Sequence, residues 1–206
     1  MPRPPSSPTA RPSDATPTGT ATTPTEKPVR AFVAVFPPPE VQKALHRAAL
    51  ALPSGDAFRL TTPEKIHLTL KFLGEVPEET LDRAKISLAQ IGEGHEPFEV
   101  ATSGFGVFPT ERKARILWAG VGEGSKRLRA LAHDVEEALE AAGFERETRP
   151  YVPHMTLGRT RGRPVGFDAG GVRAPALRFT VAGLDLVRSV PEAGGVTYTS
   201  LEAYPL

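Results

Sequence analysis

A short pattern of histidine, threonine and apolar residues occurs twice, and it constrains the fold more than any other feature of the chain. The first copy, residues 66–72, reads IHLTLKF, and the second, residues 152–158, reads VPHMTLG. Because side chains of a β-strand alternate between its two faces, each His shares a face with the Thr two residues later. The apolar residues that flank each Thr then point to the opposite face. Each copy therefore predicts a half-buried strand with an imidazole and a hydroxyl on its open face.

These paired residues suit chemistry on a phosphate ester. Histidine has an unperturbed pKa near neutrality, so His67 and His154 could act as a general acid and a general base at pH 7. Thr69 and Thr156 could donate hydrogen bonds to an anionic oxygen. Such a site needs neither a metal ion nor a cofactor. A single His on a strand is more often a hydrogen-bonded or surface residue, and it is the matched duplication that favours catalysis.

Composition limits the setting in which this site works. The chain has 206 residues, no cysteine and a formal net charge of +1. The lack of cysteine excludes disulfides and thiolate metal sites, and it fits a reducing cytoplasm. The apolar runs fall short of the ~20 residues that span a bilayer, so we expect no membrane association. With so small a net charge, any RNA binding must come from a local patch.

Domain organisation follows from a shift in composition near the start of the chain. Residues 1–28 are dominated by Pro, Thr, Ser and Ala and have almost no large apolar side chain. Such a segment cannot bury enough surface to offset its ordering entropy, so we predict that it is disordered. Residues 29–206 carry the periodic apolar patterns of a folded domain.

Hydrophobic periodicity predicts an alternation of strands and helices in this domain. The expected strands are 29–36, 58–60, 66–72, 98–102, 114–121, 151–159, 177–190 and 196–204, and the expected helices are 39–52, 77–91 and 125–142. The glycine-rich segment 104–109 is expected to form a bend. This mixture predicts an α+β fold with largely antiparallel sheets. The two histidines are 87 residues apart (154 minus 67), which suggests two similar lobes.

The flanks of the two copies carry a family resemblance. The segments HLTLKFLGEV at 67–76 and RPYVPHMTLGR at 149–159 resemble the paired His-x-Thr-x motifs of the two-histidine phosphoesterase superfamily. They are most similar to the bacterial RNA 2′,3′-cyclic phosphodiesterases, also called 2′-5′ RNA ligases. The resemblance covers residues 29–206. It implies a bilobal, pseudo-twofold domain in which two mainly antiparallel sheets flank a central cleft, with helices on the outer faces.

The resemblance also implies a reaction and a partner. The reaction is the metal-independent hydrolysis of RNA 2′,3′-cyclic phosphate ends to 2′-phosphomonoesters. By resemblance His67 is the proton donor and His154 the acceptor, whereas the nearly symmetric copies alone leave this assignment open. Reversible, ATP-independent 2′-5′ joining would be the same site working backwards. The implied partner is RNA with a 2′,3′-cyclic phosphate terminus, and we expect a cytoplasmic monomer.

Arginines near the second copy are candidates for substrate contact. Residues 145–163 include five Arg and two Glu, an excess of three positive charges. The planar guanidinium fork suits phosphate because it can donate two hydrogen bonds. We select Arg149 and Arg159, which lie nearest the motif, together with Arg115. Ordinary solvated surface is the alternative for each of them.

Two aromatic residues near the motifs could stack on RNA bases, Phe72 and Tyr151. In an unbroken strand each would face away from its His. We therefore expect Phe72 in the core first and as a stacking residue second, whereas Pro153 could break the alternation at Tyr151. The remaining large aromatic residues are assigned to the core: Phe32, Phe36, Trp118 and Phe179.

Three other functions remain open on the sequence alone. The chain could be an RNA-end-binding module without catalysis, although both His and both Thr are present. It could be a metal hydrolase, but such sites normally recruit three or more His or carboxylate ligands, and neither motif carries an Asp or Glu at matching spacing. It could also open the cyclic phosphate of a small nucleotide instead of RNA.

Overall fold

The computed structural model describes residues 28–193 and 195–206. Nearly all of the segment predicted to be disordered, residues 1–27, lies outside the described residues. The helices are α1 (Pro39–Leu50), α2 (Glu78–Gly94) and α3 (Ser125–Ala141). The strands are β1 (Val29–Val35), β2 (Phe58–Leu60), β3 (Leu68–Val76), β4 (Phe98–Phe108), β5 (Ile116–Val121), β6 (His154–Thr160), β7 (Arg178–Val181), β8 (Gly183–Glu192) and β9 (Gly195–Pro205).

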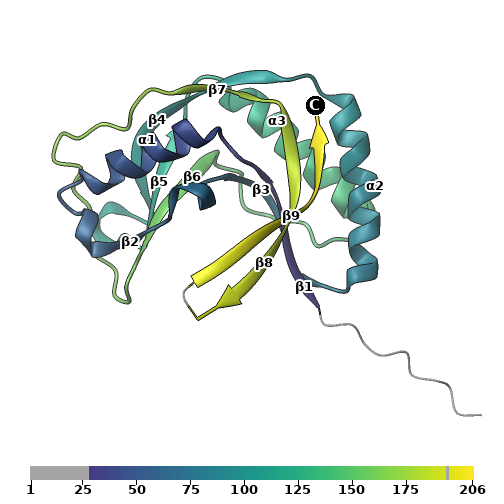
Figure 1. The fold of residues 1–206 in the computed structure, drawn as a ribbon, viewed down its shortest axis with the longest axis horizontal. Coiled ribbons are helices and arrows are strands. Elements are labelled where there is room, and N and C mark those ends of the chain that lie inside the picture. Colours follow the sequence, from purple (N-terminus) through teal and green to yellow (C-terminus); the bar gives the residue numbers. More distant parts are fainter. Residues whose placement is uncertain (1–27, 194) are drawn as a thin grey trace, which may run out of the picture.

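The strands form a curved antiparallel sheet that arches over an open side (Figure 1). Their order is β7-β4-β5-β6-β3-β1-β8-β9, and β2 pairs with β6. The two motif strands, β3 and β6, meet at the centre of this order through one register pair, Leu68 with Met155. The predicted α+β fold with two antiparallel lobes is confirmed, and the sheets of the two lobes are joined at the motifs.

Two segments repeat the same order of elements and give the fold its pseudo-twofold character. β1, α1 and β3 form one segment, and β5, α3 and β6 form the other. In each segment the two strands pair antiparallel with each other. Each helix crosses to the other half, because α3 contacts β3 and α1 contacts β6. Each motif strand is therefore supported by the helix of the opposite half.

The main hydrophobic core lies between the helices and the sheet. Predicted apolar stripes point into it at helical spacing, as in α3, where Leu128, Leu131, Val135 and Leu139 are fully buried. The core-facing residues of the motif strands, such as Leu68 and Met155, complete it from the sheet side. Since the helices cover this face, the opposite face of the motif strands is left open for a site. No helix in the described part of the chain is long and apolar enough to span a membrane.

Two predicted boundaries differ from the structure. The glycine-rich segment 104–109 does not form a separate bend, because β4 continues to Phe108 and pairs with β5 over this stretch. Gly106 is needed there, since a Cβ on it would lie 2.2 Å from the indole ring of Trp118. The expected strand 177–190 is two strands: β7 pairs with β4 and β8 pairs with β1, so the chain crosses from one half to the other.

Candidate active site

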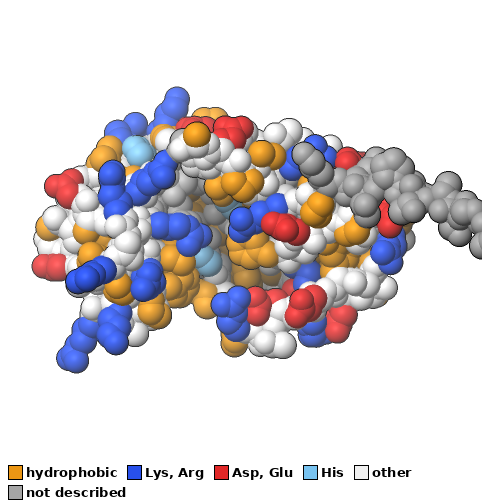
Figure 2. Space-filling model, turned by 90° about the horizontal axis from the view of Figure 1, so that it is seen from below, with side chains coloured by type: hydrophobic (Ala, Val, Ile, Leu, Met, Phe, Trp, Pro, Cys, Tyr) orange, Lys and Arg blue, Asp and Glu red, His pale blue; other side chains and the backbone are white. Residues whose placement is uncertain are grey.

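The two motif histidines lie side by side at the junction of the halves. His154 begins β6, and His67 directly precedes β3. Their next residues, Leu68 and Met155, are register partners and fully buried on the core side. The predicted alternation is thus confirmed, and both imidazoles lie on the open face. Figure 2 shows histidine side chains within a hollow of this face, surrounded by apolar side chains.

Both imidazoles are held in the same way, through the carbonyl oxygen two residues earlier. Nδ1 of His67 lies 2.8 Å from the Lys65 carbonyl oxygen, and Nδ1 of His154 lies 2.7 Å from the Val152 carbonyl oxygen. A carbonyl only accepts hydrogen bonds, so each Nδ1 is the protonated nitrogen. This fixes the tautomer and leaves Nε2 of each ring for proton transfer.

Thr69 is positioned to act with His67. Its Oγ1 lies 3.0 Å from Nε2 of His67, and with Nδ1 protonated the hydroxyl donates to that nitrogen. Thr156 occupies the equivalent place two residues after His154 on β6 and is half-buried. The two hydroxyls and two Nε2 atoms are the polar groups that the motifs present to the open face.

Aromatic rings surround each histidine. Phe32 stacks on His67 with ring centroids 4.9 Å apart, while Tyr198 and Phe36 approach the same ring at 5.3 and 5.4 Å. Phe32 is buried as predicted, but it lies in a separate small hydrophobic cluster on the histidine side of the sheet, and Phe36 packs against that cluster. The alternation of β1 gave no signal, since both of its faces are apolar.

The second histidine has its own aromatic neighbours. Phe108 meets His154 edge-on at 5.1 Å, and the Trp118 ring centroid lies 6.1 Å from it. The assignment of Trp118 to the core is therefore wrong, whereas Phe179 is a core residue as predicted. The sequence signal for Trp118 was the glycine at position 106, which leaves room for its indole.

The apolar surroundings control the charge of the histidines. Burial lowers the pKa of His67 to about 4, although its hydrogen bond to the Lys65 carbonyl acts in the opposite direction. Burial also lowers the pKa of His154, with a further contribution from the positive charge of Arg159. Desolvation disfavours the charged imidazolium, so both rings are neutral at pH 7 in the free protein.

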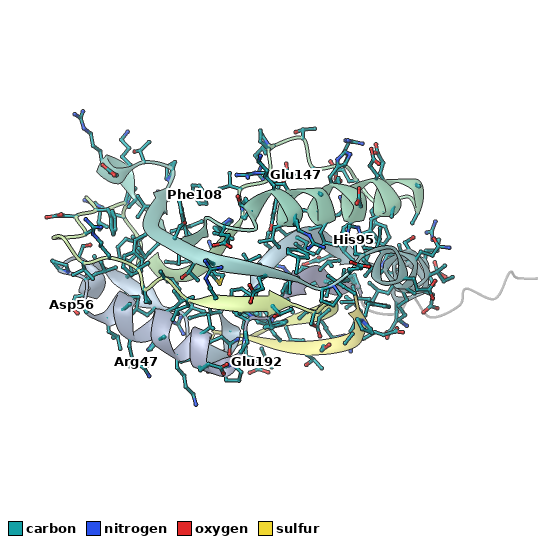
Figure 3. All side chains as sticks on the ribbon, turned by 90° about the horizontal axis from the view of Figure 1, so that it is seen from above. Arg47, Asp56, His95, Phe108, Glu147 and Glu192 are labelled. Carbon is teal, nitrogen blue, oxygen red and sulfur yellow. The ribbon has the colours of Figure 1, made fainter. Side chains whose placement is uncertain are left out.

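The arginine candidates fall in different places. Arg159, on β6, is close enough for its charge to act on both histidines and on Tyr198. Arg149 exposes 84% of its side chain and pairs with Glu147 at 2.7 Å. Figure 3 shows Glu147 beside α3. Arg115 donates to the Gly162 carbonyl oxygen at 3.3 Å. Of these three arginines, only Arg159 lies close enough for its charge to act on the histidines.

The core assignment of Phe72 is wrong for a structural reason. Its side chain is 65% exposed, and its ring lies 6.1 Å from that of Phe32 on the histidine side. β1 pairs with Thr69 and then with Lys71, so Leu70 is an extra residue in β3. This irregularity inverts the alternation beyond it, buries Lys71 and turns Phe72 outward. Phe72 is thereby available for stacking.

Tyr151 does not share that position. Its ring packs against the main core, and burial raises the pKa of its hydroxyl. The positive charge of Arg129 on α3 acts in the opposite direction and lowers this pKa. These surroundings favour a structural role for Tyr151 over base stacking.

Comparison with known proteins identifies the family of this chain. The model of the 2′-5′ RNA ligase superfamily matches residues 34–191. The chain belongs to this superfamily. The resemblance seen in the two histidine motifs is thus confirmed over most of the domain.

Named members of the superfamily are similar along nearly their whole length. A curated RNA 2′,3′-cyclic phosphodiesterase of Methanothermobacter thermautotrophicus is 34% identical over 187 residues, covering 86% of this chain and 99% of the relative. Another, from Thermus thermophilus, is 36% identical over 186 residues, covering 86% and 90%. The crystal structure of apo LigT from E. coli has a TM-score of 0.71 at 26% identity, covering 88% of this chain and 99% of LigT.

Proposed function

We propose that this protein is an RNA 2′,3′-cyclic phosphodiesterase that works by paired-histidine acid–base catalysis. The observation that carries the proposal is the matched pair of imidazoles, each fixed through Nδ1 with Nε2 left for proton transfer. The two curated relatives named above support the activity, since both are called RNA 2′,3′-cyclic phosphodiesterases. Crystal structures of E. coli LigT with 3′-AMP and with phosphate show that this relative binds such groups.

In the proposed reaction, water attacks the phosphorus of the cyclic phosphate. Nε2 of His154 takes the proton from the water as the new P–O bond forms. The bond from phosphorus to O3′ breaks, and Nε2 of His67 gives a proton to O3′, which leaves a 2′-phosphomonoester. Thr69 and Thr156 donate hydrogen bonds to the non-bridging oxygens, where charge develops, and Arg159 adds a positive charge nearby.

The donor role of His67 places a requirement on substrate binding. In the free protein burial holds its pKa at about 4, so the ring has no proton to give at pH 7. An anion beside an imidazolium favours the charged form and raises the pKa. We infer that binding of the anionic cyclic phosphate raises the pKa of His67, so that the ring takes up a proton from solvent and is charged correctly only with substrate bound.

Reversible 2′-5′ joining of RNA ends follows from the same site by microscopic reversibility. The 5′-hydroxyl of a second strand would attack the phosphorus of the cyclic phosphate in place of water, the bond from phosphorus to O3′ would break with a proton passing to O3′, and a 2′-5′ phosphodiester would form without ATP. We keep this activity as secondary, because hydrolysis uses water at bulk concentration.

The experiment is hydrolysis of a short RNA ending in a 2′,3′-cyclic phosphate, with a chelator present and the product identified by phosphorus NMR. A 2′-phosphomonoester is the expected product. Tight binding of the RNA end without turnover would favour the RNA-end-binding module instead. Turnover that disappears with the chelator would favour a metal hydrolase, and exclusive turnover of mononucleotides would favour a small-nucleotide enzyme.

A further inference from the structure

Two arginines stand directly opposite each other beside the histidines. Strand β2 pairs with β6, and in this register Arg59 is the partner of Arg159. Both residues are exposed. Side chains at such positions have Cβ atoms about 4.5–5.5 Å apart. An anion beside the two guanidinium groups could accept hydrogen bonds from both of them.

Both arginines belong to the histidine face. Arg159 acts on the pKa of His67 and of His154, so its charge lies near both rings. Directly opposite residues of paired strands project to the same face, and Arg59 therefore projects to the same side. Phe58, the residue before Arg59, is 3% exposed and packs in the main core on the other side.

Arg59 also extends from its own half to the other. A Cβ built on Gly195 would lie 3.4 Å from Nη2 of Arg59. Gly195 begins β9 at the tip of the β8–β9 hairpin, and the same strand carries Tyr198, which packs edge-on against His67. The tip also carries an exposed carboxylate, Glu192, the register partner of Gly195. The Arg59 guanidinium therefore lies where β2 and the hairpin approach each other.

This placement defines a second position for a phosphate. Beside the neutral histidines, the positively charged Arg159 and Arg59 lie on neighbouring strands of one face. In an RNA end, the phosphate nearest to the 2′,3′-cyclic phosphate is the 5′-phosphodiester of the same nucleotide. We propose that Arg59 binds this 5′-phosphodiester and so makes the site prefer RNA chains over nucleoside 2′,3′-cyclic phosphates. The inference rests on the proposed function and extends it to substrate choice.

The test compares two substrates that differ in this one phosphate. One is a dinucleotide ending in a 2′,3′-cyclic phosphate, and the other is the matching nucleoside 2′,3′-cyclic phosphate without a 5′-phosphate. For Arg59→Gln we expect kcat/KM on the dinucleotide to fall about tenfold to a hundredfold, as for loss of a charged hydrogen bond. On the nucleoside cyclic phosphate we expect a change of less than about twofold, because the variant keeps the histidine site.

A matched variant separates this contact from general electrostatics. Arg47 is exposed on α1 (Figure 3), and Arg47→Gln removes the same charge without touching the site. It should leave both substrates unchanged, while Arg59→Lys should fall between wild type and Arg59→Gln on the dinucleotide. Equal losses on both substrates for Arg59→Gln would show that Arg59 only supports the hairpin, and would overturn the phosphate subsite. Failure of the wild type on both substrates would instead overturn the proposed function.

Discussion

His67 and His154 have the same sequence pattern, but their surroundings make them different. Phe32 stacks on His67 and Tyr198 meets it edge-on, whereas His154 has Phe108 and Trp118 as its ring neighbours. The pKa of His67 is lowered to about 4, and that of His154 is lowered as well. The alternation of the motifs predicts which face the histidines occupy. The rings that control their protonation come from distant strands, and local periodicity carries no information about them.

The lowered pKa of His67 predicts an acid sensitivity of the fold. Above pH 6.5 the ring is neutral in both folded and unfolded chains and contributes nothing. Between pH 6.5 and about 4 the unfolded chain binds the proton more readily, so stability falls as the pH falls. By pH 5 the free energy of unfolding has fallen by about 2 kcal/mol. Between pH 7.5 and pH 5 we therefore expect wild type to lose that amount of stability in excess of any loss by His67→Asn, measured by urea unfolding.

The Asn variant is the matched control, since its amide can still donate to the Lys65 carbonyl but cannot titrate. If both proteins lose the same stability on acidification, the pKa of His67 is not lowered by its surroundings.

A further measurement links the pKa of His67 to the mechanism. Inorganic phosphate should raise the pKa of His67 in an NMR titration, because the bound anion stabilises the imidazolium.

Phe72 leads to a prediction on substrate binding. Its ring is exposed on the histidine side, and stacking of a base on such a ring is worth ~1–3 kcal/mol. We expect Phe72→Ala to raise KM for RNA at least fivefold with little change in the free energy of unfolding. Ile86→Ala is the control, because Ile86 on α2 is equally exposed and should change neither quantity. A Phe72→Ala protein with unchanged KM would exclude this ring as a stacking surface.

At the scale of elements, strands that keep the ideal alternation were predicted well and irregular ones were not. The motif strands place Leu68 and Leu157 in the core as their pattern requires. One extra residue at Leu70 then reverses the faces at Lys71 and Phe72, and a second irregularity follows at Leu73. No residue type at that position marks the irregularity, because Leu suits either arrangement. The position of Phe72 could therefore not be predicted from parity.

The same irregularity turns Lys71 toward the core, where it joins β3 to α3. Lys71 is 3% exposed, pairs with Glu136 and donates to the Glu145 carbonyl oxygen at 2.7 Å. Glu136 also accepts from the backbone N–H of Glu147, so it anchors the loop that leads to the second motif. We expect Lys71→Met to lower the free energy of unfolding by about 3 kcal/mol, since it leaves the half-buried Glu136 carboxylate without its cation.

A double variant tests whether this loss of stability comes from the ion pair of Lys71 with Glu136. Lys71→Met combined with Glu136→Met should lose less stability than the sum of the two single changes, measured by chemical unfolding. Lys85→Met is the matched control, because Lys85 pairs with Asp82 at the surface and should change stability by less than about 1 kcal/mol. Strict additivity of the two buried changes would mean that Lys71 and Glu136 do not interact.

At the scale of the whole molecule, the site exists only because the halves are interleaved. The α+β class and the two lobes follow from element order and from the spacing of the motifs. The joining of β3 to β6 through Leu68 and Met155, and the crossing of the chain between β7 and β8, depend on long-range pairing. Phe32 and Tyr198 reach His67 from strands more than 160 residues apart in the chain (198 minus 32). Sequence spacing gives no measure of such contacts.

The most direct test of the paired-histidine claim is the single-turnover rate of cyclic-phosphate opening by wild type, His67→Ala, His154→Ala and the double variant. General acid and base catalysis each contribute ~10²–10⁴-fold. The account predicts that each single variant loses at least a hundredfold in rate while remaining folded. Because the two residues act as one unit, the double variant should lose far less than the product of the single losses. A single variant within tenfold of wild type would contradict the two-histidine mechanism.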